Sequence, residues 1–283
     1  MSQLTKYLNI FSKEIEEIKL RKDNRKFELK KIGSRSFLTN STFEKEDFCF
    51  LCQYNQNIIE VYYNPLKINK EYLNVPNITD ETLEDIFKYL AHHEYGHSLL
   101  NESTKKSFNV LNKRVITTKS KRNIILKTII FIFREFFADW QAKMTGSNIP
   151  NFYLDQVFQN IEEVFTLIKF LKFPNSTISL NDLILLFYYK FLYPSVYYHV
   201  FNRWDYLMEK CGRFKDLELI NIVSKINYFF EDLIKSTSDI YVYKKALLEL
   251  ASLLKNIDYF ELFLKNNLKD QTNLKFNNIL DLL

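Results

Sequence analysis

The stretch FKYLAHHEYGHSLL, from Phe87 to Leu100, contains three of the four histidines in this chain of 283 residues. His92, His93 and His97 fall within six consecutive positions. A chain so poor in histidine that gathers it in one stretch is expected to use the imidazoles together. What they can do depends on the surface to which the stretch directs them.

The stretch belongs to a long predicted helix that begins at Thr79, which can cap it, while Asp80 and Glu81 suit the positive end of the helix dipole. Residues at steps of three and four share one face of a helix. The apolar face of this helix consists of Leu83, Ile86, Phe87, Leu90 and Ala91. At the same steps the face continues with Glu94 and His97, and His93 lies beside them. The sequence therefore predicts that these histidines point into the protein, not to water.

The residues HEYGH, His93 to His97, match the pattern H-E-x-x-H. Positions i and i+4 lie one turn apart on the same face of a helix, so two imidazoles at this spacing can bind one zinc ion. The glutamate after the first histidine is placed to take a proton from the water that such a metal activates. We therefore predict His93 and His97 as metal ligands and Glu94 as the general base. The alternative is a chance match, which composition alone produces in under about one chain in a hundred of this length.

A catalytic zinc site needs a third protein ligand and an open position. His92 lies about 100° around the helix from His93 and does not easily join the same site. The longer pattern H-E-x-x-H-x-x-G-x-x-H is absent, because Leu100 and Ser103 stand at its last two fixed positions. The third ligand is therefore His199 or a carboxylate.

The segment REFFADWQA, residues 134–142, offers carboxylates on a second predicted helix, which runs from about residue 124 to 145 and is capped by Gly146. Glu135 and Asp139 are spaced i and i+4 and share a side with two alanines. Small side chains there, and Gly96 on the first helix, would let two metal-bearing helices approach closely. That approach gives a reason for a helical glycine, which otherwise costs about 1 kcal/mol relative to alanine. The alternative is a surface Glu and Asp on an amphipathic helix.

The pair of motifs, H-E-x-x-H and then E-x-x-[AS]-D on a later helix, resembles the gluzincin zinc metallopeptidases. These include the thermolysin-like enzymes, the membrane CAAX and heat-shock metallopeptidases, and the minigluzincins. The resemblance covers about residues 56–200. It implies Glu135 as third ligand of one zinc ion and Asp139 as the carboxylate that holds the imidazole of His93. It also implies a peptide or protein substrate bound extended along the strand near Ile58–Tyr63, which looks like the family's edge strand.

The segment YPSVYYHV, residues 193–200, is similar to the H-P-S-x-x-x-R-[IV] sequence that membrane members carry after the glutamate helix. Tyr193 stands in place of that histidine and His199 in place of the arginine. The resemblance implies that either Tyr193 or His199 donates a hydrogen bond to the oxyanion of the reaction. The alternative is that this tyrosine-rich segment simply packs in the core.

Together these residues imply a zinc metalloendopeptidase of gluzincin type. Zinc would make a bound water more acidic, and Glu94 would accept the proton and return one to the leaving amine. The alternative from another class is a zinc-containing latent or non-catalytic interaction or regulatory protein on the same fold. In that case the C-terminal helices would cover the cleft or bind a partner.

The expected fold is α+β: mostly helical, with a small N-terminal mixed sheet packed on the two metal-bearing helices. An amphipathic helix occupies the first 25 residues. Strands are predicted at FELKKI, FCFLCQY and NIIEVYYN between residues 27 and 69, closed by a turn at NPLKIN. Further helices are predicted at about 152–172, 180–192, 195–210, 216–235 and 240–265. We expect a catalytic domain over residues 1–210 and a helical C-terminal extension over 211–283.

Residues 101–123 hold seven lysines and arginines and one glutamate, and they predict a solvated loop. The alternative is a patch for an acidic partner or a membrane surface. The whole chain carries a net charge of +5 that is spread along its length, so nucleic acid is not an expected partner. Residues 183–201 are long enough to span a membrane, but Lys190 and Pro194 favour a buried helix and a break. Membrane association is possible and not favoured.

Apolar residues make up 47% of the chain and charged residues 26%, as in soluble globular proteins. The start MSQLTKYLNIFSKEIEEIKL lacks a basic segment followed by an apolar run, so no signal peptide is expected. Three cysteines cannot form a disulfide framework, which favours a reducing, cytoplasmic setting. Cys49 and Cys52 form a C-x-x-C, but on one strand they would point to opposite faces. We expect all three cysteines to be core thiols.

Overall fold

The computed structural model of the protein describes residues 2–20, 23–32, 48–54, 57–116, 121–170, 191–211, 218–237 and 240–256. Over these residues the fold is mostly helical with a small mixed sheet, which confirms the predicted α+β class. The chain divides into two compact units, residues 1–105 with 137–153, and residues 106–136 with 154–283. The expected boundary at residue 210 stays a prediction.

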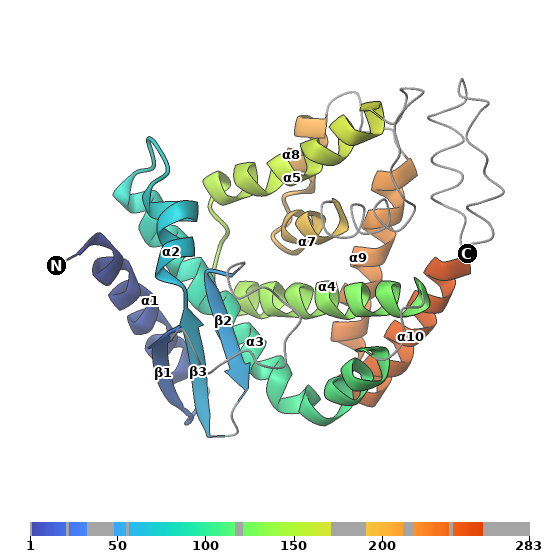
Figure 1. Ribbon diagram of the computed structural model, residues 1–283, viewed down its shortest axis with the longest axis horizontal. Coiled ribbons are helices and arrows are strands. Elements are labelled where there is room, and N and C mark those ends of the chain that lie inside the picture. The colour runs from blue at the N-terminus through green and yellow to red at the C-terminus, as the bar shows by residue number, and fades with distance from the viewer. Residues whose placement is uncertain are drawn as a thin grey trace. The chain divides into compact units, whose positions relative to one another are not determined.

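The sheet of the first unit has the order β1 (Lys26–Lys31), β3 (Ile58–Tyr63), β2 (Phe50–Tyr54). β3 pairs parallel with β1 along its whole length and antiparallel with β2 from Tyr63 to Ile59, so it lies between them (Figure 1). The expectation that Ile58–Tyr63 is an edge strand is therefore wrong. The alternation of residues along a strand indicates which face of the strand is buried, but it does not indicate which strands lie at the edges of the sheet. The outer strands of the described sheet are β1 and β2.

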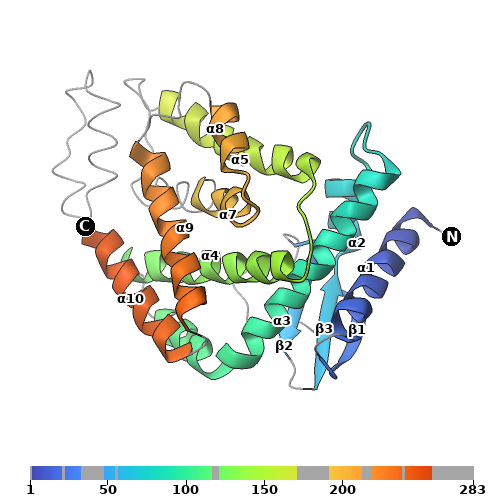
Figure 2. The same ribbon diagram turned by 180° about the vertical axis from the view of Figure 1, so that it is seen from behind.

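One face of the sheet and two helices share an aromatic core. Phe11 of α1 (Gln3–Leu20) stacks on Phe50 of β2 at 4.3 Å between ring centroids. The ring of Phe50 then meets Phe87 of α3 (Asp80–Ile116) edge-on at 5.9 Å. α1 lies beside the sheet when the molecule is seen from behind (Figure 2). Ile59 and Val61 of β3 point into this core, and Glu60 between them pairs with Lys30 on the other face.

Two expectations of irregular structure in this part of the chain are wrong. NPLKIN forms the short helix α2 (Pro65–Ile68), because Asn64 accepts hydrogen bonds from the amides of Leu66 and Lys67 and so caps it. The π-helix η1 (Asn69–Leu73) follows directly. The basic segment 101–123 is also not a loop, since α3 extends to Ile116 and α4 begins at Lys121. That segment contains neither glycine nor proline, and its lysines and arginines are good helix formers.

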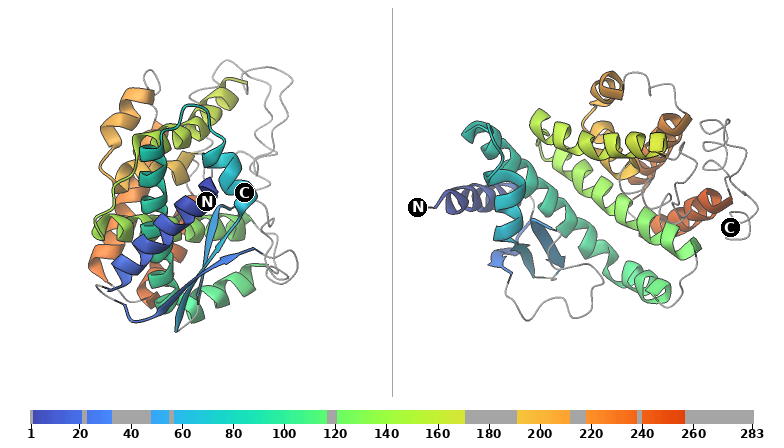
Figure 3. Two further views of the ribbon diagram at one scale, coloured as in Figure 1. Left: turned by 90° about the vertical axis from the view of Figure 1, so that its left-hand side faces the viewer. Right: turned by 45° about the horizontal axis from the view of Figure 1, so that its top comes forward.

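The two long helices begin and end where their capping residues predict. The hydroxyl of Thr79 accepts a hydrogen bond from the amide of Thr82 at 3.1 Å, at the start of α3. α4 (Lys121–Met144) is one continuous helix (Figure 3) and ends at Gly146, whose φ is +92°. The amide of Gly146 donates to Lys143 and that of Ser147 to Ala142, the pair of bonds of a Schellman cap.

The second unit is helical in its described part. It contains all but the first three residues of α5 (Asn151–Phe170), together with α7 (Tyr193–Val200), α8 (Trp204–Cys211), α9 (Glu218–Ser236) and α10 (Ile240–Asn256). The single helix predicted at 195–210 is wrong, because Asn202 has a φ of +55° and closes a Schellman turn after α7. The helix predicted at 180–192 lies mainly outside the described residues. In the described ranges, no helix is long and apolar enough to cross a membrane.

Within the first unit, α3 and α4 meet at Gly96. A Cβ atom on this glycine would lie 2.6 Å from the carbonyl oxygen of Ala138 and 2.8 Å from its Cα. Both are backbone atoms, which cannot move aside as a side chain can. The predicted close approach of the two helices is confirmed, and it leaves no room for any side chain at residue 96.

We expect Gly96→Ala to destabilise the protein by about 1–3 kcal/mol, the usual cost of forcing an extra carbon into a packed contact. In a helix with free space around the glycine, the same change stabilises the protein by about 1 kcal/mol. The sign of the change in the free energy of unfolding therefore shows whether the two helices are in close contact at Gly96. The measurement is the free energy of unfolding of metal-free protein in urea. Lys88→Ala, on the exposed face of α3, is the control and should change it little. A stabilised Gly96→Ala variant would contradict the close approach.

Candidate metal centre

α3 brings a stripe of three side chains to its buried face at steps of four: Tyr89, His93 and His97. His93 is 7% exposed, Glu94 6% and His97 9%, which confirms that the motif faces inward. The helix is held at this orientation by its apolar face, where Leu83, Ile86 and Phe87 are buried in the core. Polar groups so deeply buried need partners, and α4 supplies them.

The first partner is Asp139, which is fully buried one residue beyond the Gly96 contact on α4. Its Oδ1 lies 2.7 Å from Nδ1 of His93. Because a carboxylate only accepts, this hydrogen bond places the ring proton of His93 on Nδ1. Nε2 of His93 then carries a lone pair, as a metal ligand requires. The contact predicted between Asp139 and His93 is present.

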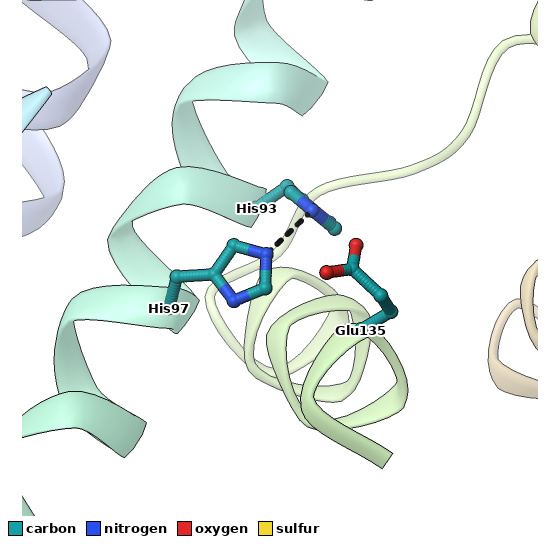
Figure 4. A group of neighbouring side chains, drawn as sticks. All are labelled: His93, His97 and Glu135. Carbon is teal, nitrogen blue, oxygen red and sulfur yellow. Dashed lines mark hydrogen bonds between the residues drawn. The ribbon is translucent and has the colours of Figure 1, made fainter. Parts of the chain in front are cut away.

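The two ring nitrogens of the motif face one another, with Nε2 of His93 3.1 Å from Nε2 of His97 (Figure 4). Zinc–nitrogen bonds of about 2.0–2.1 Å at a tetrahedral angle set two ligand nitrogens about 3.3 Å apart. The spacing of the two imidazoles therefore fits joint binding of one metal ion. The orientation of His93 by Asp139 supports the same arrangement.

Glu135 completes the group. It lies one turn before Asp139 on α4, and its carboxylate is directed to the two imidazoles (Figure 4). One ligand atom each from His93, His97 and Glu135 lie within 4.8 Å of one another, so the three residues could hold a metal ion. The resemblance to gluzincins implied Glu135 as the third member of this set, and the structure brings all three members together.

Glu94 follows the first histidine on α3 and is buried. Cys49 directly precedes β2. Burial, with smaller contributions from the carboxylates of Glu71 and Glu94, raises the pKa of the Cys49 thiol to about 12. A thiol with this pKa stays protonated at neutral pH and is a poor metal ligand. Cys52 is buried in β2. Cys52 is therefore the core thiol that was expected, whereas Cys49 is only half-buried. The side chain of Cys211 lies outside the described residues.

Tyr193, at the start of α7, contacts the candidate ligand Glu135. Its hydroxyl lies 3.5 Å from Oε2 of that carboxylate and 2.7 Å from the hydroxyl of Tyr197. The ring of Tyr193 packs against Phe131 of α4 at 5.5 Å. Tyr197, one turn later on α7, was not predicted; its i+4 spacing from Tyr193 is the only sequence signal for it.

His199, the other candidate oxyanion donor, is paired elsewhere in the second unit. Its Nε2 lies 2.6 Å from Oε2 of Glu231 on α9, and its ring meets Tyr228 edge-on. Burial opposes the charge of Glu231, but hydrogen bonds from Lys235 and His199 outweigh it and hold the pKa of this carboxyl below its usual value. One turn earlier, Asn227 of α9 donates to Ser195 of α7 at 2.8 Å. These bonds tie α7 to α9, and they assign His199 a structural contact.

Two further polar residues join the elements around the motif. The ring of His92 bridges Thr145, 2.6 Å from Nδ1, and Glu14 of α1, 3.0 Å from Nε2. Its place outside the ligand group agrees with the prediction. The hydroxyl of Tyr89 donates to Oδ1 of Asp139 at 2.6 Å. Tyr89 was not predicted as a site residue, although its position four residues before His93 puts it on the ligand face.

No protein-family model matches the chain, and neither a curated protein nor a solved structure matches it. The resemblance to gluzincins therefore depends on the two motifs and on the group formed by His93, His97 and Glu135.

We expect Asp139→Asn to weaken zinc binding about 10–100-fold, because it removes the charged acceptor that orients His93. The measurement is competition with a chelating dye for zinc. Asp85→Asn, an exposed aspartate on α3, is the matched control and should leave the affinity unchanged. Equal affinities for Asp139→Asn and the unmodified protein would show that this carboxylate does not orient a ligand.

Proposed function

We propose that this protein is a zinc-dependent metallopeptidase that hydrolyses peptide bonds, with Glu94 as the general base. The observation that carries the proposal is the convergence of His93, His97 and Glu135 from two helices, with a glutamate directly after the first histidine. Two imidazoles and one carboxylate are a ligand set of catalytic zinc sites and leave a fourth position for water or substrate. A zinc ion there would act as a Lewis acid and lower the pKa of its water towards neutrality.

The roles of the chain's own residues follow from their positions. His93 and His97 offer nitrogen lone pairs, and Asp139 keeps the proton of His93 on the far nitrogen. Glu94 accepts the proton of the attacking water and returns one to the leaving amine. Glu94 is adjacent in the chain to the ligand His93 and shares its buried helix, which places its carboxylate beside the metal group.

The oxyanion of the reaction needs a hydrogen-bond donor, and contacts favour Tyr193 over His199. The Tyr193 hydroxyl lies 3.5 Å from the carboxylate of the proposed ligand Glu135, and it shares a 2.7 Å hydrogen bond with the hydroxyl of Tyr197. Nε2 of His199 is engaged with Glu231. A phenol hydroxyl is a neutral donor and can stabilise developing negative charge without itself ionising.

The substrate is proposed to be an extended peptide paired with the sheet. Both edges of Ile58–Tyr63 are paired with neighbouring strands, so this strand cannot also pair with a peptide. We therefore propose that the peptide pairs with the outer edge of β2. β2 begins next to Cys49, whose thiol is within electrostatic reach of Glu94. In the described part of the sheet, β2 is the outer strand on the side of β3 away from β1. Main-chain pairing there would bind peptides with little dependence on their side chains.

The low exposure of His93, Glu94 and His97 also favours the second candidate, a latent or non-catalytic zinc protein. A peptide must reach these residues to be cut, and in this structure each is less than one-tenth exposed. The two candidates differ in turnover and agree in metal binding. Stoichiometric zinc without hydrolysis of any unfolded protein would support the second.

Glu94→Gln is expected to keep the bound zinc and to lower the hydrolysis rate of an unfolded protein substrate by about 10²–10⁴-fold. The change removes the proton acceptor while leaving the three ligands in place. Glu84→Gln, on the same helix and paired with Lys6, is the control and should retain activity. Purified protein without stoichiometric zinc would end the metallopeptidase proposal, and an unaltered rate in Glu94→Gln would exclude this residue as base.

Tyr193→Phe is expected to lower kcat about 10²–10³-fold with little change in KM, because an oxyanion donor acts in the transition state. Tyr197→Phe removes only the neighbour of that hydroxyl and should have a smaller effect. The assays use variants whose zinc content equals that of the unmodified protein. If His199→Gln lowers kcat in folded protein while Tyr193→Phe does not, His199 is the donor.

A further inference from the structure

Asp139 receives two hydrogen bonds on the same oxygen. Oδ1 accepts from the hydroxyl of Tyr89 at 2.6 Å and from Nδ1 of His93 at 2.7 Å. Asp139 is fully buried and Tyr89 is 1% exposed. All three residues belong to the first unit, so this arrangement is internal to it.

The second oxygen of Asp139 has no hydrogen-bond partner among the described atoms and is buried. A buried carboxylate is costly unless donors surround it. Oδ1 therefore carries the hydrogen bonds that the structure gives this carboxylate, and one of its two donors comes from a residue outside the metal motifs. Removing Tyr89 would leave His93 as the only donor of this pair.

Tyr89 is itself held in place. Its ring packs against Tyr153 at 5.3 Å between centroids and lies 6.0 Å from the ring of His93. A hydroxyl on a packed ring has few alternative positions, so its bond to Asp139 restrains the rotation of the carboxylate. The carboxylate in turn sets the plane of the His93 ring, and this ring directs Nε2 towards Nε2 of His97.

We propose that Tyr89 is a positioning residue of the metal centre: its hydroxyl holds the Asp139 carboxylate in the orientation that presents the His93 nitrogen to the metal. Tyr89 is not a member of the candidate ligand group and acts through Asp139. The inference rests on the metal site of the proposed function and is independent of whether the protein hydrolyses peptides.

The test compares the zinc affinity of Tyr89→Phe with that of the unmodified protein, by competition with a chelating dye. Phenylalanine keeps the ring and removes only the hydroxyl. We expect about tenfold weaker binding, the lower end of the range for residues that support a metal ligand. The visible absorption spectrum of the Co²⁺-loaded protein should also change, because it reports the geometry of the ligands.

Tyr7→Phe is the matched control. Tyr7 is also buried, and its hydroxyl donates to Asp80 at 2.8 Å at the start of the same helix. The variant loses a tyrosine–aspartate hydrogen bond of the same kind at a site that the metal ligands do not share. Its zinc affinity and Co²⁺ spectrum should match those of the unmodified protein.

A double-mutant cycle with Asp139→Asn identifies the route of the effect. If Tyr89 acts through Asp139, Tyr89→Phe has no further effect on zinc affinity in the Asp139→Asn protein. Equal affinities of Tyr89→Phe and the unmodified protein, or additive losses in the cycle, overturn the inference. Should Tyr89→Phe fail to fold, a further loss of zinc affinity in the double variant relative to Asp139→Asn still overturns the inference, because the hydroxyl would then act by a route other than Asp139.

The outcomes separate this inference from the proposed function. An unmodified protein that binds no zinc overturns both. Bound zinc with a tenfold loss in Tyr89→Phe, but no peptide hydrolysis, supports the positioning role and ends the peptidase proposal. Bound zinc and hydrolysis with no loss in Tyr89→Phe supports the peptidase and ends the positioning role.

Discussion

The candidate metal centre depends on the close approach of α3 and α4 at Gly96. A Cβ atom at that position would lie 2.6 Å from a backbone oxygen of α4, so the helices meet main chain to main chain. This contact sets the depth at which the next residue of α4, Asp139, meets α3. With one more carbon between the helices, the 2.7 Å hydrogen bond from His93 to Asp139 would lengthen or break. One absent side chain thereby determines the distance on which the ligand geometry depends.

The polar groups of the centre form a series of hydrogen bonds that runs outward from the imidazoles, and each group orients its inner neighbour. The imidazole nitrogens face one another, Asp139 fixes one ring, and Tyr89 holds Asp139. Burying these polar groups is unfavourable for folding, and Oδ2 of Asp139, which has no hydrogen-bond partner among the described atoms, makes it more so. Burial of the apolar residues on the same helices offsets this unfavourable free energy. A buried carboxylate and two facing imidazoles are weak evidence for added stability, and the group they form with Glu135 could hold a metal ion.

Local patterns predicted well where one residue or one spacing sets the geometry. Thr79 and Gly146 were placed at the ends of their helices, because capping involves only neighbours in the chain. The charge of segment 101–123 wrongly predicts a loop, because charge density says little about helix formation in a run without glycine or proline. The break between α7 and α8 was missed because asparagine adopts positive φ less often than glycine, and its presence alone does not announce a turn.

The sequence by itself determined that two histidines and a glutamate share the inward face of a helix, since the 3.6-residue period follows from the chain alone. It also determined that Glu135 and Asp139 occupy one side of a second helix. Tertiary structure decided the rest: that these two sides meet, that β3 is central in the sheet and not at its edge, and that Tyr89 donates to Asp139. These are contacts between residues 50 positions apart or between separate strands. They depend on packing across the whole core, which no local period records.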